Sequence, residues 1–231
     1  MAVFKRAGDV HVRMASTYVL GLTGGIAAGK STLVAMLRRR NVAVWEADRV
    51  VEALYAPGGG ASRAVRRVCP EAVDEQERVD RDVLADMLRR RPEKLAELEA
   101  AVHPLVARAR DAYVEERREK HVPLVVVDVP LLYETGGEKN VDGVLLAHAE
   151  RHVRETRALE RPGMTREKLD MILARQWNDE TKLQRADYVI DTSGDLADVE
   201  AQLDQLLDHL RTTRGPTLQN KTEKESQPEE T

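Results

Sequence analysis

Short apolar segments alternate with longer segments of helical periodicity along most of the chain. The segment at residues 122–129 is apolar on both faces, which predicts an interior strand. Strands separated by helices predict an α/β fold with a five-stranded parallel, doubly wound sheet flanked by helices, whose ligands bind at the carboxyl ends of the strands. The five segments typical of strands cover residues 18–22, 41–45, 122–129, 144–147 and 188–191.

Helical periodicity dominates the chain between these strands. Residues 31–38 contain no Gly or Pro and place Leu33, Met36 and Leu37 on one helix face. Residues 61–120 are helical in character, with breaks at residues 69–70 and 91–92, and this stretch exceeds the usual crossover connection. We therefore expect a helical insertion that holds a second substrate. A closing amphipathic helix packed on the sheet is predicted by Leu196, Val199, Leu203, Leu206 and Leu210.

Composition restricts the classes of function. The 231 residues are 42% hydrophobic, enough for the core of one α/β domain, and the formal net charge of -4 argues against nucleic acid as the main partner. Cys69 is the single cysteine, which excludes an intramolecular disulfide framework and favours a reducing compartment. No apolar segment approaches the roughly 20 residues needed to span a membrane. Residues 1–17 lack the apolar core of a secretory signal, so we expect a soluble, cytoplasmic protein with no membrane partner.

Candidate chemistry begins directly after the first strand, where residues 24–31 (GGIAAGKS) match G-x-x-x-x-G-K-[ST], the phosphate-binding loop. Glycines let backbone N–H groups turn toward phosphate oxygens, Lys30 reaches the β- and γ-phosphates, and the Ser31 hydroxyl holds Mg²⁺. A glycine-rich turn that binds nothing is the alternative, but the flanking strand and helix favour the phosphate loop. The residues expected to bind ATP are Gly24, Gly25, Ala27, Ala28, Gly29, Lys30, Ser31 and Thr32.

Two acidic residues follow strands that end at the same edge of the predicted sheet. Asp128 stands at the end of the interior strand, where phosphate-loop proteins keep a second Mg²⁺-organising carboxylate, so Ser31 and Asp128 are the predicted metal ligands. Asp48 follows the strand at residues 41–45 and is placed where an acceptor hydroxyl would bind. Together with the phosphate loop, these carboxylates indicate phosphoryl transfer, which depends on positioning and charge neutralisation.

Six arginines lie in residues 151–175, a segment interrupted by Pro162-Gly163 and restarted by Thr165 as a helix N-cap. Arginine suits a phosphate enzyme because its planar guanidinium stays charged, whereas the alternative is a solvated basic helix. We assign function to Arg157 and Arg161, which lie four residues apart on one predicted helix face, and structure to most of the others.

Histidines give weaker indications. His103-Pro104 interrupts the helical insertion, and on chemistry alone a helix junction with a capping histidine is favoured over a ligand role. His148 and His152 are spaced for zinc, but their H-x-E-x-H order is not that of metalloproteases and no third ligand is evident. We interpret this pair as surface residues.

Other nucleotide-binding functions use the same loop. A regulatory GTPase would need an N-K-x-D motif after a late strand, and the nearest match, NKTE at residues 220–223, lies in the polar tail. A nucleoside monophosphate kinase, and an ATP-dependent binding protein that uses its nucleotide state as a switch, stay open on the motif alone.

Further blocks narrow these alternatives: residues 21–26 (GLTGGI), 29–31 (GKS), 47–48 (AD), 103–104 (HP), 128–134 (DVPLLYE), 175–176 (RQ) and 186–191 (ADYVID). With these blocks in this order, the chain resembles the dephospho-CoA kinases of coenzyme A synthesis over about residues 18–211. The resemblance implies a P-loop kinase fold in which ATP phosphorylates the ribose 3′-hydroxyl of dephospho-CoA, the last step of coenzyme A synthesis.

The resemblance also implies roles for individual residues. Asp48 would orient or deprotonate the acceptor hydroxyl, Arg157 and Arg161 would stabilise the transferring phosphoryl group, and Thr23 and His103 would bind substrate. The domains expected are an N-terminal extension at residues 1–17, a kinase domain at 18–211 and a disordered tail at 212–231. The kinase domain would contain a CoA-binding helical insertion at about 49–120 and a lid at about 151–180, in a monomer or small homo-oligomer.

Two positions depart from the family pattern. Glu46 stands where the family usually has the first Asp of Asp-Ala-Asp, which leaves Asp48 in place but puts the role of residue 46 in doubt. Thr192 replaces the usual Asn after the last strand, so the contact to the adenine end of ATP is uncertain.

Overall fold

The computed structural model describes residues 3–4 and 17–213, which divide into two compact units. Among the described residues, the core unit comprises residues 3–4, 17–44 and 117–213, and the helical unit comprises Trp45–Glu116. The predicted N-terminal extension, apart from residues 3, 4 and 17, and the predicted tail beyond Thr213 lie outside the described residues.

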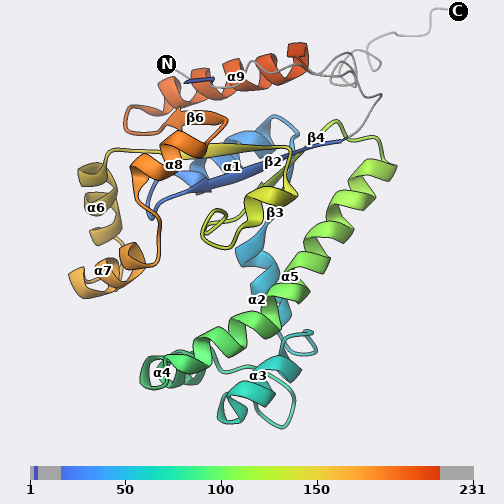
Figure 1. Cartoon of the computed structure of the whole chain (residues 1–231), viewed down its shortest axis with the longest axis vertical. Coiled ribbons are helices and arrows are strands. Elements are labelled where there is room, and N and C mark those ends of the chain that lie inside the picture. The colour runs from blue at the N-terminus through green and yellow to red at the C-terminus, as the bar shows by residue number, and fades with distance from the viewer. Residues whose placement is uncertain (1–2, 5–16, 214–231) are drawn as a thin grey trace, which may run out of the picture. The chain divides into compact units, whose positions relative to one another are not determined.

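A central sheet organises the core unit (Figure 1). Its order is β1-β6-β5-β2-β4-β3, and β2 pairs in parallel with both β4 and β5. The predicted five-stranded parallel sheet is confirmed, and the short β1 adds an antiparallel pairing with β6 that the sequence pattern did not indicate. The strands are β1 (Val3–Phe4), β2 (Tyr18–Gly24), β3 (Ala43–Glu46), β4 (Leu124–Asp128), β5 (Gly143–His148) and β6 (Tyr188–Asp191).

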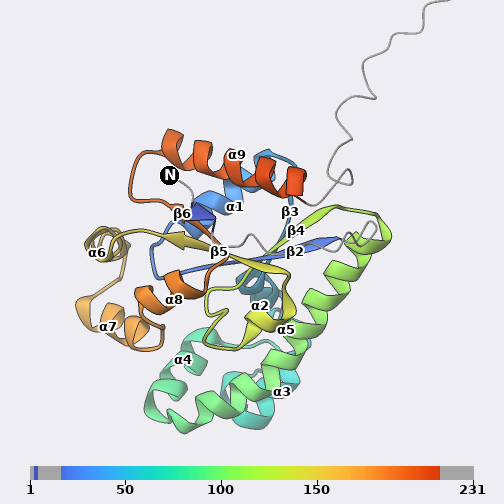
Figure 2. The same ribbon diagram turned by 45° about the horizontal axis from the view of Figure 1, so that its top comes forward.

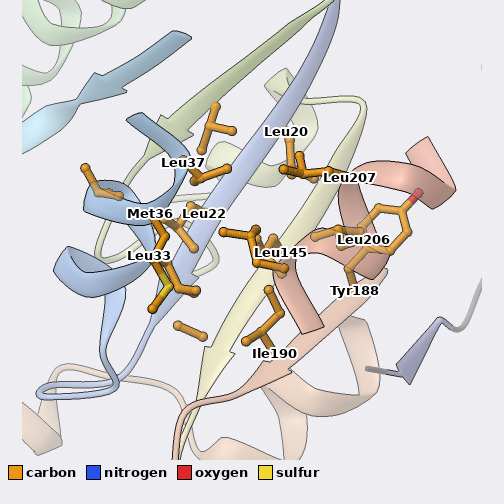
Figure 3. Close-up of a cluster of buried hydrophobic side chains, with 14 of the residues drawn as sticks. Leu20, Leu22, Leu33, Met36, Leu37, Leu145, Tyr188, Ile190, Leu206 and Leu207 are labelled. Carbon is orange, nitrogen blue, oxygen red and sulfur yellow. The ribbon is translucent and has the colours of Figure 1, made fainter. Parts of the chain in front are cut away.

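The main hydrophobic core covers one face of this sheet. Figure 2 shows helix α1 (Lys30–Arg39) and helix α9 (Leu196–Thr213) on that face. The predicted faces are buried except at Leu196, which is 64% exposed because the helix begins there and its buried stripe starts at Val199. Figure 3 shows how side chains from α1, α9 and the strands interlock, among them Leu20, Leu22, Leu33, Met36, Leu37, Leu145, Ile190 and Leu206.

The opposite face is covered by helix α8 (Asp179–Arg185) and by the turn around η2 (Gly137–Asn140). Lys182 of α8 is fully buried there, and its Nζ lies 2.7 Å from Oε1 of Glu134. Tyr133 and Trp177 stack with their ring centroids 5.8 Å apart. A buried ion pair and an aromatic pair therefore attach α8 to the loop that follows β4.

Helices α6 (Arg151–Leu159) and α7 (Arg166–Ala174) follow β5 and form the arginine-rich segment. The predicted interruption at residues 162–163 is confirmed, and the Thr165 side chain accepts a hydrogen bond from the Lys168 N–H as the N-cap of α7. The placement of Arg161 on one helix face with Arg157 was wrong. Helix α6 ends at Leu159, because Pro162 disfavours helical conformation at the residue before it.

The helical unit contains α2 (Ala47–Tyr55), α3 (Ser62–Val68), η1 (Pro70–Ala72), α4 (Arg81–Arg90) and most of α5 (Glu93–Glu119). The breaks predicted at residues 69–70 and 91–92 are confirmed, since α3 ends at Val68 and α4 at Arg90. The helix junction predicted at His103-Pro104 was wrong, because α5 runs through Pro104. Val102 and Leu105, on either side of the proline, pack into the same hydrophobic cluster, and this packing compensates for the missing N–H.

Candidate active site

The phosphate loop lies between β2 and α1, at the point in the sheet order where the neighbours β4 and β5 lie on opposite sides of β2. Two of its residues have left-handed backbone conformations, Ala27 with φ 56° and Gly29 with φ 78°. Such turns direct successive N–H groups into a concave anion site, and the N-terminus of α1 adds its dipole. A Cβ at Gly29 would lie 3.1 Å from Thr192, so both the backbone conformation and the limited space favour glycine there.

Carboxylate and ammonium groups meet beside this loop. Strand register pairs Leu22 of β2 with Asp128 of β4, and Nζ of Lys30 lies 3.8 Å from Oδ1 of Asp128. Ser31 is exposed in the first turn of α1. A hydroxyl and a carboxylate supply oxygen atoms, the ligands that Mg²⁺ prefers, so the residues present fit that ion.

Thr23 lies directly before the loop, and its side chain is fully buried. Its hydroxyl donates a hydrogen bond of 3.2 Å to the carbonyl oxygen of Pro130, which follows β4. The ends of β2 and β4 are thereby attached to each other at the carboxyl edge of the sheet.

Thr192 connects three parts of the site. Its buried hydroxyl lies 3.0 Å from the carbonyl oxygen of Ala28 in the loop and 3.0 Å from that of His148 at the end of β5. Its own carbonyl accepts a hydrogen bond of 2.9 Å from Nη2 of Arg157. Arg157 is thus attached to the strand ends beside the loop, whereas Arg161 is exposed in the turn after α6. The hydroxyl of Thr192 supports the loop backbone, a role that the sequence pattern did not indicate.

Two further residues near the loop were missed by the sequence assignment. Gln176 accepts a hydrogen bond of 3.1 Å from the Ile26 N–H through its Oε1 atom. Arg154, one of the six arginines of residues 151–175, is 4% exposed and pairs with Asp179 beside Gly25. The only available signal was the presence of Gln176 in one of the family blocks.

Asp48 and His103 belong to the helical unit. Asp48 is exposed in the first turn of α2, and His103 is exposed in α5. Glu46, the residue with the uncertain role, lies 3.0 Å from Nε of Arg49 through Oε1, so its longer side chain forms a local ion pair.

Asp191, at the end of β6, has a pKa that its hydrogen bonds lower. Burial alone would raise the pKa of Asp191, but hydrogen bonds from Ser193 lower it below its ordinary value, so this carboxylate stays ionised.

Within residues 3–4 and 17–213, no group of three or more His, Cys, Asp or Glu side chains is arranged to hold a metal ion. His152 is exposed in α6, as expected of a surface residue, whereas His148 ends β5 and is half-buried, so its interpretation as a surface residue was wrong.

Sequence comparisons with known proteins agree on one family. Residues 18–198 match the model of the family described as dephospho-CoA kinase. A protein named dephospho-CoA kinase from Brucella melitensis is 42% identical over 83% of this chain and 94% of its own length. Its counterpart from Rhodopseudomonas palustris is 41% identical over 82% of this chain and 94% of its own length.

Solved structures are also similar. A crystal structure from Thermus thermophilus has 35% identity and a TM-score of 0.68, with 85% of this chain and 99% of that chain covered. The structure of dephospho-CoA kinase from Campylobacter jejuni supports the fold. It has 18% identity and a TM-score of 0.60, with 85% of this chain and 98% of that chain covered. Among the described residues, no helix is long and apolar enough to cross a bilayer.

Proposed function

The chain belongs to the dephospho-CoA kinase family, and from that membership we propose how its residues carry out the reaction. The reaction is the ATP-dependent phosphorylation of the ribose 3′-hydroxyl of dephospho-CoA, which yields coenzyme A and ADP in the last step of coenzyme A synthesis. The observation that carries the proposal is the phosphate loop beside the Lys30–Asp128 pair, at the carboxyl edge of a parallel sheet.

ATP binds through the loop in this proposal. The loop residues Gly24, Gly25, Ala27, Ala28 and Gly29 and the first turn of α1, including Thr32, enclose its phosphates, and Lys30 neutralises the β- and γ-phosphates. Ser31 and Asp128 hold Mg²⁺, which supplies charge neutralisation at the phosphates when it is bound. Thr23 contributes by fixing Pro130, and so shapes the edge where the substrates meet.

The acceptor side uses the helical unit. Asp48 accepts the proton of the ribose hydroxyl, or orients that hydroxyl toward the γ-phosphate, and His103 contributes to binding dephospho-CoA. Arg157 and Arg161 stabilise the charge that develops on the transferring phosphoryl group, as arginines do in related transfers. The helical unit would then be the CoA-binding lobe, and the segment from α6 to α7 the lid.

Further parts of the proposal concern the whole protein. We infer a cytoplasmic enzyme that acts as a monomer or small homo-oligomer and has no nucleic-acid partner, in keeping with its net charge of -4 and single cysteine. Light scattering on the purified chain measures the oligomeric state directly.

A panel of acceptors tests the reaction. ADP release should require dephospho-CoA together with Mg²⁺, and mass spectrometry should identify coenzyme A as the product. Equal activity with nucleoside monophosphates would transfer the assignment to a nucleotide kinase. ATP hydrolysis that is independent of any acceptor would instead favour a nucleotide-dependent switch.

Substitution of Asp48 tests its role. Asp48→Asn should lower kcat about a hundredfold or more while ATP affinity stays nearly intact, because the proton acceptor is lost but the phosphate loop is not. Asp82→Asn is a matched control, since Asp82 is also exposed and is also the second residue of its helix, α4. Equal turnover of the two variants would remove Asp48 from the mechanism.

A further inference from the structure

Gln176 holds the phosphate loop from outside. Its Oε1 atom accepts the hydrogen bond of 3.1 Å from the Ile26 N–H, across 150 residues of sequence. Gln176 follows α7, and its own N–H donates to the carbonyl oxygen of Leu173 at 3.1 Å, which continues the last turn of that helix. A side chain of the connection between α7 and α8 is therefore bonded directly to the backbone of the loop.

The residues after Gln176 are also fixed. The Trp177 N–H donates a hydrogen bond of 2.8 Å to Oε1 of Glu134, the carboxylate that pairs with the buried Lys182. Asp179 pairs with Arg154, whose Nε donates to the carbonyl oxygen of Ala149 at 3.0 Å. Because Trp177 and Asp179, which follow Gln176 closely in the chain, are both anchored, Gln176 has little freedom to leave the loop.

Space and apolar packing reinforce this contact. A Cβ at Gly25 would collide with Nη1 of Arg154, so the loop passes the guanidinium closely only because residue 25 is glycine. Ala27 packs with Ala158 of α6 and Leu169 of α7 in one buried cluster, against which Ile26 also packs. Residues 25–27 are therefore enclosed by side chains of α6, α7 and the connection to α8.

We propose that Gln176 is a positioning residue that keeps the phosphate loop in its ATP-binding shape and thereby couples the segment from α6 to α8 to nucleotide binding. This proposal rests on the proposed function only in taking residues 24–31 as the site of ATP's phosphates. Without the acceptor, the Ile26 N–H lacks a partner in the enclosed loop, and competing loop conformations become populated. Apparent affinity for ATP falls in proportion to the population of the competent conformation.

Two variants of Gln176 and one control test the proposal. Gln176→Leu removes the acceptor at similar volume, and Gln176→Glu keeps an oxygen acceptor for Ile26. Gln184→Leu is the matched control, because Gln184 is exposed on α8 and makes only an exposed contact of 3.5 Å with Glu180. The measurements are amide exchange at Ile26, calorimetric Kd for Mg-ATP, kcat, KM for each substrate, and Tm.

We expect faster exchange at Ile26 and about tenfold weaker ATP binding in Gln176→Leu. The KM for dephospho-CoA should stay within about twofold of the unsubstituted protein. Gln176→Glu should preserve the protection of the Ile26 amide, and Gln184→Leu should change none of these quantities. A selective loss at the ATP step supports positioning.

Two results would overturn the proposal. One is a Gln176→Leu variant whose Ile26 exchange and ATP affinity match those of Gln184→Leu. The other is a loss that lowers Tm and weakens both substrates equally, which would indicate a purely structural role. Exchange and ATP binding are measured without an acceptor, so they decide the proposal even if the protein does not phosphorylate dephospho-CoA.

Discussion

Replacing Lys182 with methionine removes the buried charge that faces Glu134. The Lys182 side chain is 1% exposed, that of Glu134 is 9% exposed, and their charged atoms lie 2.7 Å apart. Glu134 would keep the hydrogen bond from the Trp177 N–H but lose its cation. The carboxylate would then be buried without an opposite charge, because methionine fills similar space but offers no charge.

The expected loss follows from that burial. Removing one partner of a buried ion pair costs about 3–5 kcal/mol of unfolding free energy. For a chain of this size, each kcal/mol lowers Tm by about 2–4 °C, so Lys182→Met should lower Tm by about 6–20 °C. The large value arises from the unpaired charge that remains, not from the attraction that is lost.

A double-mutant cycle measures this coupling. Thermal and urea unfolding would be followed for Lys182→Met, Glu134→Gln and the double variant, which should be more stable than Lys182→Met because it buries no charge. Lys94→Met is the control, since the Lys94–Glu97 pair is exposed to solvent and should contribute little. The reasoning fails if Lys182→Met loses no more than the control, or if the losses of the two single variants simply add.

Three further perturbations have defined outcomes. Thr192→Val removes the hydroxyl that supports the Ala28 carbonyl. It should lower the free energy of unfolding in urea by about 1–2 kcal/mol and weaken ATP binding in calorimetry, whereas Thr192→Ser keeps the hydroxyl and should change neither quantity. Gly25→Ala should weaken ATP binding about tenfold, because the added Cβ collides with Arg154. A double variant that also carries Arg154→Gln should regain part of the ATP affinity measured by calorimetry. Burial, assisted by the charge of Asp187, raises the pKa of Tyr133 above that of a tyrosine in the unfolded chain. Stability should therefore be unaffected below about pH 10 and fall as pH rises further, because the unfolded chain then loses the proton more readily. Tyr133→Phe should show a smaller drop in the urea midpoint between pH 8 and pH 11.

The local sequence pattern was sufficient to predict the strands and helices that carry the candidate active site. The five parallel strands, the helix after the phosphate loop and the N-cap at Thr165 all depend on neighbours in sequence, where periodicity and capping act directly. Lys30 and Asp128 were predicted at one edge because parallel strands end together, and they lie 3.8 Å apart.

Predictions that rested on a single local rule were less secure. Proline was expected to break the helix at Pro104, but apolar packing on both sides of it sustains α5. A spacing of four residues suggested one helix face for Arg157 and Arg161, but the helix ends between them. In each case a second interaction outweighed the rule.

The amino-acid order alone therefore specifies the five parallel strands as segments, the phosphate loop and the family blocks, because each of these depends on residues close together in the chain. Only the folded chain brings Gln176 to Ile26, Thr192 to Ala28 and Arg154 beside Gly25. The first two of these contacts span 150 and 164 residues, and no periodicity in the sequence marks the residue pairs that form them. They arise where separate segments of the core unit meet, and they determine how firmly the phosphate loop is held.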